Sequence, residues 1–301
     1  MVLNFYGLAI DQVAAGEWLK PNNLDRNVNL GEMQAFVRAQ TRLAADVYYG
    51  LDLVHLRRLL AAGFPVIIEK GYEPNDDAWM GHYLTLFGYD EARQVFYGLD
   101  TFLGPWDSQG REELYAAVAA NWQHFNYAAV VVYPPAQVAQ VQALVGAEYS
   151  DAQRMWQNAA SRAQVEIERE PENAFAWFNL GSSLTELGRL ADDPTPYNAQ
   201  AAAAFDQART LGLPFRMLWY QFTPYEAYLG VGRLEDVLAL AEATISTEGG
   251  QTIEETYLYQ GRVWEQQGDD EAARAAYSKA ISLNPRFAAA AEALAALNSG
   301  E

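Results

Sequence analysis

The second half of the chain repeats one order of aromatic, small and proline residues. The shared positions are Trp177, Gly181, Ala201, Phe205, Ala208 and Pro214 in one copy and Tyr257, Gly261, Ala273, Tyr277, Ala280 and Pro285 in another. Small residues let two helices approach closely, aromatic residues fill the space towards the next pair, and proline ends the second helix. The pattern therefore predicts stacked helix-turn-helix pairs.

Weaker signals extend this array in both directions. A looser copy lies at residues 225–237, residues 151–170 have the character of the second helix of a degenerate first pair, and residues 286–298 are suited to cap the stack. Residues 191–198 lengthen the turn of the first full copy, where insertions are tolerated. We expect an all-α array over residues 136–301.

The repeated pattern resembles the tetratricopeptide repeats. This resemblance implies a concave face, lined by the first helix of each pair, that binds a peptide or a partner protein. On the phase set by Trp177 and Tyr257, the side chains expected on that face are Phe175, Phe178, Ser182, Trp219, Phe222, Glu226, Leu258 and Arg262. In the competing interpretation, the aromatic members pack against a neighbouring domain or repeat.

The first half of the chain has a mixed pattern. The predicted elements are helices at 30–40 and 51–62, a strand at 65–69 and a hairpin formed by residues 82–88 and 94–100. Asn27 or Asn29 is suited to cap the first helix, and Asp52 lies in the first turn of the second. We therefore expect an α+β domain, with a boundary near Pro135.

The predicted hairpin brings together two residues that can carry chemistry. His82 and Asp100 are equally far from a turn centred on Glu91, so a symmetric register places them opposite each other, with Cβ atoms about 5 Å apart. Such an aspartate can orient an imidazole through one ring nitrogen while the other nitrogen serves a nucleophile. The structural alternative is a satisfied histidine and an aspartate that caps a turn.

Four features occur in order around this hairpin: the segment 63–68, the segment 81–90 with its Gly-His-Tyr, Asp100, and the residues from Trp122 to Pro134. Together they resemble the papain-like cysteine peptidases related to the bacteriocin-processing, double-glycine leader endopeptidases. The resemblance implies that residues 1–135 form a papain-like domain in which helices pack on an antiparallel sheet. It also implies that His82 is the general base and Asp100 its orienting acid.

In that family the nucleophile is a cysteine in a Cys-Gly-Pro segment at the start of the first core helix, and an upstream glutamine contributes to the oxyanion hole. A helix N-terminus suits this role because it lowers a thiol pKa and offers free N–H groups. Residues 1–7 resemble the end of that helix, so both residues are expected before Met1. The chain has no cysteine, and no Ser or Thr precedes Thr41. We expect no peptidase activity from the chain as it stands.

Composition narrows the possible partners and cofactors. The chain carries 20 Lys and Arg against 39 Asp and Glu, a net charge of −19, which repels phosphate backbones, so no nucleic-acid partner is expected. No apolar run reaches the length of about 18 residues that a membrane span requires. The sequence shows neither zinc-ligand spacing nor a phosphate loop, so we expect no metal and no cofactor. His55 and His124 are assigned structural roles.

Three functions remain open. The first is a thiol peptidase whose cysteine lies before Met1, with the repeats positioning a substrate. The second is a non-catalytic protein, a pseudopeptidase with a tetratricopeptide adaptor, that binds peptide without cutting it. The third is a structural adaptor in which the first domain is a spacer. The compartment is the cell envelope or exterior if an export signal precedes Met1 and the cytoplasm otherwise, and the oligomeric state is open.

Overall fold

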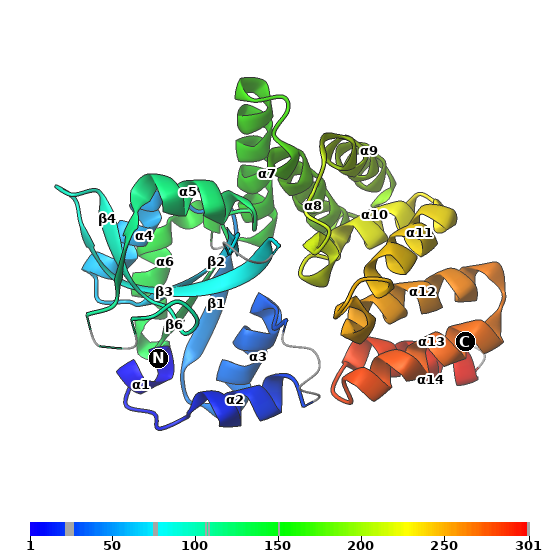
Figure 1. Cartoon of the computed structure of the whole chain (residues 1–301), viewed down its shortest axis with the longest axis horizontal. Coiled ribbons are helices and arrows are strands. Elements are labelled where there is room, and N and C mark those ends of the chain that lie inside the picture. The colour runs from blue at the N-terminus through cyan, green and yellow to red at the C-terminus, as the bar shows by residue number, and fades with distance from the viewer. Residues whose placement is uncertain (22–26, 75–77, 106, 108, 150, 300–301) are drawn as a thin grey trace.

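The computed structural model describes residues 1–21, 27–74, 78–105, 107, 109–149 and 151–299. Figure 1 shows a sheet with its helices on the left and a curved stack of helices on the right. The last helices of the stack return to the N-terminal part near the end of α2. This arrangement agrees with the α+β domain and the all-α array expected from the sequence.

The N-terminal part is built on a six-stranded antiparallel sheet. Its strands are β1 (Ala44–Tyr48), β2 (Val66–Tyr72), β3 (Met80–Asp90), β4 (Val95–Leu99), β5 (Arg111–Leu114) and β6 (Ala129–Tyr133). Their order across the sheet is β1-β6-β2-β3-β4-β5, and each neighbouring pair is antiparallel. Four of the five residues of the predicted strand 65–69 lie in β2, and the predicted hairpin is β3 and β4.

The helices that the structure describes in this part are α1 (Val2–Phe5), α2 (Gln12–Leu19), α3 (Leu30–Gln40), α4 (Leu53–Ala61) and α5 (Tyr115–Gln123). Contacts join α4 and α5 to β2 and α3 to β1 and β6. Asn29 caps α3 in a capping box with Glu32, which confirms one of the two predicted caps. Asp52 is the N-cap of α4 rather than a residue of its first turn.

The helical part runs from residue 138 almost to the end of the chain. Its helices are α6 (Val138–Val145), α7 (Ala152–Arg169), α8 (Ala174–Leu190), α9 (Thr195–Leu211), α10 (Thr223–Gly230), α11 (Leu234–Ile245), α12 (Glu254–Gln267), α13 (Asp270–Leu283) and α14 (Ala288–Ser299). From α7 onward, each helix packs against the next. A Cβ added at Gly181 would lie 2.7 Å from the ring of Phe205, so the small residue permits the contact between α8 and α9.

Two details of the array differ from expectation. The helix α9 begins at Thr195, so only the first half of the insertion 191–198 lengthens the turn, and the rest extends the helix. The looser copy at 225–237 forms the short pair α10 and α11, because Pro224 at the start of α10 prevents a longer first helix. The strands β1, β5 and β6 and the helices α2, α5 and α6 were not among the predicted elements.

One hydrophobic core runs from the sheet through the helices as far as Val263, and a smaller core surrounds Tyr277 in the last helices. The N-terminal part and the repeats therefore share packed side chains. This continuity places the repeats directly against the strands that carry the candidate site.

Candidate functional site

The structure brings His82 and Asp100 into direct contact. His82 lies near the start of β3 and Asp100 directly follows β4, and Nε2 of His82 is 2.8 Å from Oδ2 of Asp100. The aspartate side chain is fully buried, and the imidazole is 10% exposed. The predicted meeting of these two side chains is confirmed, whereas their catalytic roles stay a prediction.

The register of the hairpin differs from the symmetric one. Thr85 pairs with Leu99, which places the centre of the turn after Glu91. Asp100 therefore stands diagonally to His82 rather than directly opposite it. Diagonal neighbours on adjacent strands are within reach of aromatic and other long side chains. The predicted register is wrong, but the imidazole is long enough to reach the carboxylate from the diagonal position.

Three polar contacts hold the Asp100 carboxylate. Besides the contact with His82, its Oδ1 accepts hydrogen bonds from the backbone N–H groups of Phe102 at 2.8 Å and Leu103 at 2.7 Å. Burial raises the pKa of this carboxyl, but the bonds to His82 and to the two amides outweigh burial and lower the pKa of Asp100 to about 2. The carboxylate is thus ionised at neutral pH and can orient an imidazole or stabilise an imidazolium.

The contact with Asp100 determines which nitrogen of the His82 imidazole is available to accept a proton or a hydrogen bond. Because Nε2 of His82 faces the carboxylate, Nε2 carries the proton in the neutral ring and Nδ1 has the free lone pair. Within the described residues, Nδ1 has no hydrogen-bond partner. Tyr72 and Phe102 flank the ring, with centroids 5.7 and 6.2 Å from that of the imidazole. The predicted roles of a base and its orienting acid require such an arrangement, with one ring nitrogen held by a carboxylate and the other free.

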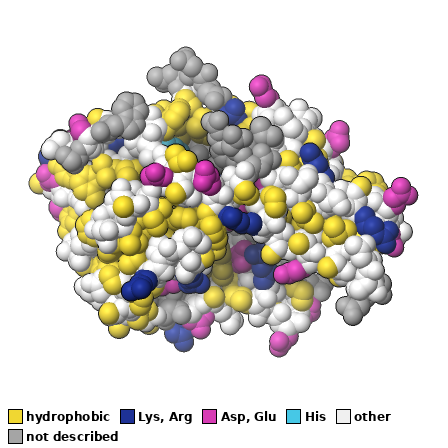
Figure 2. Space-filling model, turned by 90° about the horizontal axis from the view of Figure 1, so that it is seen from below, with side chains coloured by type: hydrophobic (Ala, Val, Ile, Leu, Met, Phe, Trp, Pro, Cys, Tyr) yellow, Lys and Arg dark blue, Asp and Glu magenta, His cyan; other side chains and the backbone are white. Residues whose placement is uncertain are grey.

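An apolar cleft of about 410 Å³ lies between α1, α2, α3 and the sheet. Its wall includes Thr101, which follows Asp100, and Thr85 of β3. The apolar part of the wall includes Val2, Ile10, Leu19, Phe36 and Val132. Figure 2 shows the molecule from the side on which α1 and α2 lie, and hydrophobic side chains cover much of its left half. The turn that holds Asp100 therefore borders an apolar space beside α1.

The groups that could react with His82 are few. The chain has no cysteine, so it offers no thiol to the free Nδ1. In the part of the chain that the structure describes, no group of three or more His, Asp or Glu could hold a metal ion.

No helix formed by the described residues is long and apolar enough to cross a membrane.

The other two histidines lie in structural surroundings. His55 is in the first turn of α4, where its Nδ1 accepts a hydrogen bond from the backbone N–H of Asp52 at 3.2 Å. Nδ1 of His55 also lies 2.8 Å from Oδ1 of Asp52, and this side-chain contact is the largest effect on the Asp52 carboxyl and lowers its pKa. His124 accepts a hydrogen bond at Nδ1 from the indole N–H of Trp79 at 3.1 Å, and burial lowers the pKa of His124 to about 4.

His124 belongs to a cluster that joins the sheet to the repeats. We call it the aromatic joint, and its members are Trp79, His124, Phe125, Phe175 and Tyr220. The ring of Phe175 stacks on that of His124 with centroids 3.7 Å apart. A Cβ added at Gly81 would lie 2.7 Å from Phe125 and 2.9 Å from Tyr220, so the joint packs directly on the residue before His82. Phe175 thus packs against the neighbouring domain, as the competing interpretation proposed.

The predicted binding residues of the repeats do not share one open face. Phe178 is 1% exposed and packs on Phe205, and Leu258 is 4% exposed in the smaller core. The expectation that these two line an open surface is therefore wrong. The physical reason is that a helix inside a stack contacts neighbouring helices on several sides. An apolar side chain on the face expected to be concave can therefore be covered by the next helix pair.

Three other predicted residues are engaged between helices. The hydroxyl of Ser182 on α8 lies 2.9 Å from that of Thr223 at the start of α10. Trp219 donates its indole N–H to the Thr247 hydroxyl at 3.2 Å. Phe222 is half-buried against the main core. These contacts give each residue a packing role, and a binding role for them stays a prediction.

Glu226 and Arg262 do lie together on a polar cleft of about 400 Å³. Glu226 forms an ion pair with Arg189 at 2.5 Å and accepts a hydrogen bond from the Tyr259 hydroxyl at 2.6 Å. The Arg262 guanidinium lies 5.2 Å from the centre of the Tyr259 ring. Sequence reasoning did not single out Arg189 for this cleft. A signal in the sequence that could have pointed to Arg189 is the Gly-Arg-Leu motif at residues 188–190, because the same motif occurs again around Arg233.

Comparison with known proteins identifies two parts of the chain. Residues 1–130 match the model of the peptidase C39 like family, and residues 254–287 match that of the tetratricopeptide repeat. No curated protein matches the chain. Among solved structures, the chain is similar to the crystal structure of MamA, with 16% identity, a TM-score of 0.39 and coverage of 48% of this chain and 78% of that one. It is also similar to a thermophilic TPR protein in Thermus thermophilus, with 16% identity, a TM-score of 0.40 and coverage of 61% and 86%. Residues 1–130 thus form a peptidase C39-like domain, and the helical array that follows includes a tetratricopeptide repeat at residues 254–287.

Proposed function

We propose that this chain binds a peptide or a protein segment through its peptidase-like domain and its repeats, and does not cleave it. The observation that carries the proposal is the His82–Asp100 pair, which is complete in a chain without any cysteine. A base and its orienting acid are present, but the thiol that they would activate is not.

The chemistry behind the lack of cleavage is direct. In thiol peptidases the thiolate attacks the peptide carbonyl, and the imidazole takes the thiol proton and later gives it to the leaving amine. The described residues include no hydroxyl within hydrogen-bonding distance of Nδ1 of His82 that could replace the thiol. The imidazole can therefore accept a hydrogen bond from a bound peptide but has no nucleophile to deprotonate.

The polar cleft supports the binding part of the proposal. It is lined by Arg189, Glu226 and Arg262, together with the neutral polar side chains of Thr185, Asn198 and Gln266. Backbone amides and polar side chains of a peptide find both donors and acceptors there. Arg189 is paired with Glu186 as well as Glu226, whereas Arg262 has no ion pair among the described residues. The Arg262 guanidinium therefore favours a segment that carries an acidic side chain.

The test measures retention and cleavage in one experiment. A mixture of synthetic dodecapeptides of randomised sequence is passed over the immobilised chain between pH 5 and pH 9, and mass spectrometry reads retained and cleaved peptides. We expect retention without new termini. Arg262→Ala should reduce retention about tenfold, as the loss of a charged contact predicts. Arg274→Ala, on the exposed side of α13, is the matched control and should retain the wild-type level. Absence of any retained peptide would contradict the proposal.

A thiol peptidase is the second candidate, and the free Nδ1 of His82 favours it. To test it, a segment carrying Cys-Gly-Pro is fused ahead of Met1, and the same peptides are assayed. This candidate predicts cleavage that disappears in His82→Ala and when the added cysteine is replaced by alanine. If the extended chain cleaves nothing, the non-catalytic proposal is favoured. If the chain without the added segment cleaves peptides and His82→Ala abolishes this cleavage, the non-catalytic proposal is contradicted.

A further inference from the structure

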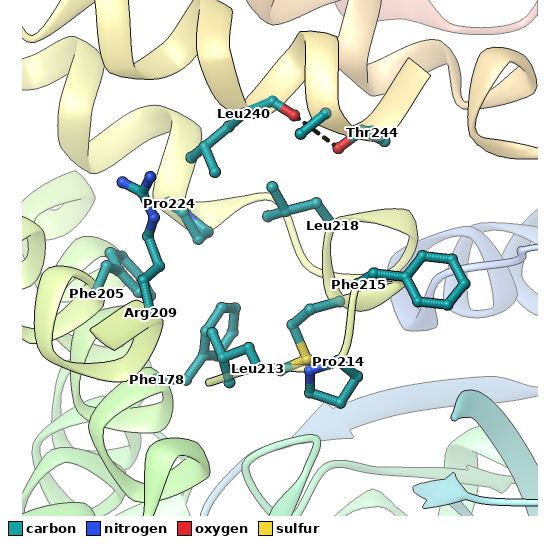
Figure 3. A pocket seen from close by; sticks show the side chains of 12 residues that line it. Phe178, Phe205, Arg209, Leu213, Pro214, Phe215, Leu218, Pro224, Leu240 and Thr244 are labelled. Atoms are coloured by element: carbon teal, nitrogen blue, oxygen red, sulfur yellow. Dashed lines mark hydrogen bonds between the residues drawn. The ribbon is translucent and has the colours of Figure 1, made fainter. Parts of the chain in front are cut away.

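A separate pocket of about 200 Å³ lies in the helical array and is partly open to solvent, because Phe215 and Ala243 on its wall are exposed. Its wall is formed by α8, α9, α11, Pro224 of α10 and the segment 212–222 that links α9 to α10. Figure 3 shows the side chains around it, and the apolar ones include Phe178, Phe205, Leu213, Leu218 and Leu240. Binding pockets for small molecules are concave and mostly apolar, and this pocket has both properties.

Pro224 lines the pocket and explains why the segment before it is not helical. Proline has no N–H and its ring collides with the carbonyl four residues earlier, so no helix can run through residues 220–224. The chain accordingly forms only a short turn at Met217–Trp219 before α10 begins at Thr223. The segment 212–222 therefore stays outside α10, and five of its residues line the pocket: Leu213, Pro214, Phe215, Met217 and Leu218.

The polar groups on the wall already have partners. The Thr244 hydroxyl donates to the carbonyl of Leu240 at 2.9 Å and lies 3.1 Å from the hydroxyl of Tyr225. The Arg209 guanidinium lies 3.5 Å from the Asp236 carboxylate and donates to the Tyr228 hydroxyl at 3.3 Å. A charged ligand group would have to compete with Asp236 for Arg209. The wall therefore favours an occupant that is neutral and apolar.

We propose that this pocket binds a small neutral apolar molecule, of the size of one aromatic ring or a short branched alkyl chain. An apolar cavity of about 150 Å³ is enough to hold benzene, so one ring fits the volume found here. Phe178 and Phe205 offer aromatic surface, and Leu213, Leu218 and Leu240 offer aliphatic surface. The site is independent of His82 and of the polar cleft, so it goes beyond the proposed function.

Toluene is the probe for this site. It is added to the whole chain, and binding is followed by saturation-transfer NMR on its methyl group and by thermal unfolding. A ligand that binds only the folded state raises Tm, by about 5 °C at a concentration of about 100 times Kd for a chain of this size. Benzoate, which has the same ring and a charge, should raise Tm by less than a fifth of that amount.

Two variants of α11 make the test specific. Ala243 lines the pocket and is exposed, so Ala243→Phe can fill the space without displacing the helix. Ala239, four residues earlier and also exposed, does not line the pocket, and Ala239→Phe is the control. We expect toluene to shift Tm in the wild type and in Ala239→Phe but not in Ala243→Phe. An equal shift in both variants, or no saturation transfer in the wild type, would overturn the proposal.

Discussion

Among the contacts that join the N-terminal part to the repeats, two groups, which we call joints, are built from opposite kinds of side chain. The aromatic joint beside His82 contains no charged group at neutral pH, because burial keeps His124 neutral. The second contact, which we call the ionic joint, consists of Lys20, Glu32, Glu254 and Asn284. It joins the end of α2 to the start of α12, where Figure 1 shows the last helices returning to the N-terminal part.

The ionic joint is deeply buried. Nζ of Lys20 is 2.7 Å from Glu254 and 3.1 Å from Glu32, and the side chains of Lys20 and Glu254 are 5% and 1% exposed. Burial, followed by the nearby charge of Glu254, raises the pKa of the neighbouring Glu255 well above its usual range. Buried ion pairs add little net stability compared with apolar packing, but they are costly to break. They therefore specify one docking geometry, whereas the aromatic joint supplies apolar contact.

The largest effect is expected for Lys20→Met. The variant keeps much of the side-chain volume but removes the cation beside the buried Glu254 and the partly buried Glu32, which should cost about 3–5 kcal/mol of unfolding free energy. Chemical denaturation at neutral pH measures this change. The control is Arg274→Met, which removes the exposed ion pair with Asp270 and should change stability by less than about 0.5 kcal/mol. Equal losses in the two variants would show that burial gives the ionic joint no special importance.

The aromatic joint should respond to pH instead. His124 has a pKa of about 4 in the folded chain against about 6.5 when unfolded, so the unfolded state binds more protons between these values. The contribution of neutral His124 to the unfolding free energy is therefore complete above about pH 6.5. This contribution, up to about 3 kcal/mol, is lost as pH falls towards 4. Protonation would also place a second donor against the indole N–H of Trp79.

The measurement is the unfolding free energy of the wild type and of His124→Gln between pH 4 and pH 7. Glutamine keeps a polar side chain but cannot take up a proton. We expect the wild-type curve to fall with acid in this range and the variant curve to be flatter. Parallel curves would mean that the neutral state of His124 does not stabilise the joint.

Local signals in the sequence predicted local structure well. The helix at 30–40 and its Asn29 cap follow from short-range spacing, and both are present in α3. The contact between His82 and Asp100 followed from hairpin symmetry, although a shifted register makes it diagonal. The pattern of a hairpin predicts which two strands pair, but it predicts their register less well. An irregularity such as the register shift between Leu86 and Gly88 changes which residues stand opposite each other.

Contacts between distant segments were not predictable in the same way. Nothing near Tyr220 indicates that it packs on Gly81, because that contact depends on how the whole array is placed against the sheet. The same limit explains why Phe178 and Leu258 are buried rather than exposed. Their positions along the helix were predicted from the repeat pattern, but whether they are exposed depends on how the next helix pair packs. The pairing of Lys20 with Glu254 likewise appears only when the array curves back.

The His82–Asp100 pair combines features of both joints, because it is charged yet lies in partly apolar surroundings. The pKa of Asp100 is about 2 in the folded chain, below the unfolded value of about 3.9, so its contribution is complete above about pH 4 and is lost as pH falls towards 2. Asp100→Asn should cost about 2 kcal/mol at neutral pH. Urea denaturation of both proteins from pH 2 to pH 7 should show the difference shrinking in acid. A difference that does not change with pH would contradict the ionised contact.

The smallest effect is expected for Tyr220→Ala, which tests whether the repeats brace the strand that carries His82. The ring of Tyr220 lies edge-on to those of Trp79 and Phe125 and covers Gly81. Its removal should cost about 1–2 kcal/mol and speed amide hydrogen exchange at residues 80–83. Phe215→Ala is the control, because Phe215 lies in the same linking segment but is 54% exposed. If exchange rises only within the repeats, the aromatic joint fastens the array without steadying β3, and the position of His82 depends on Asp100 and its turn alone.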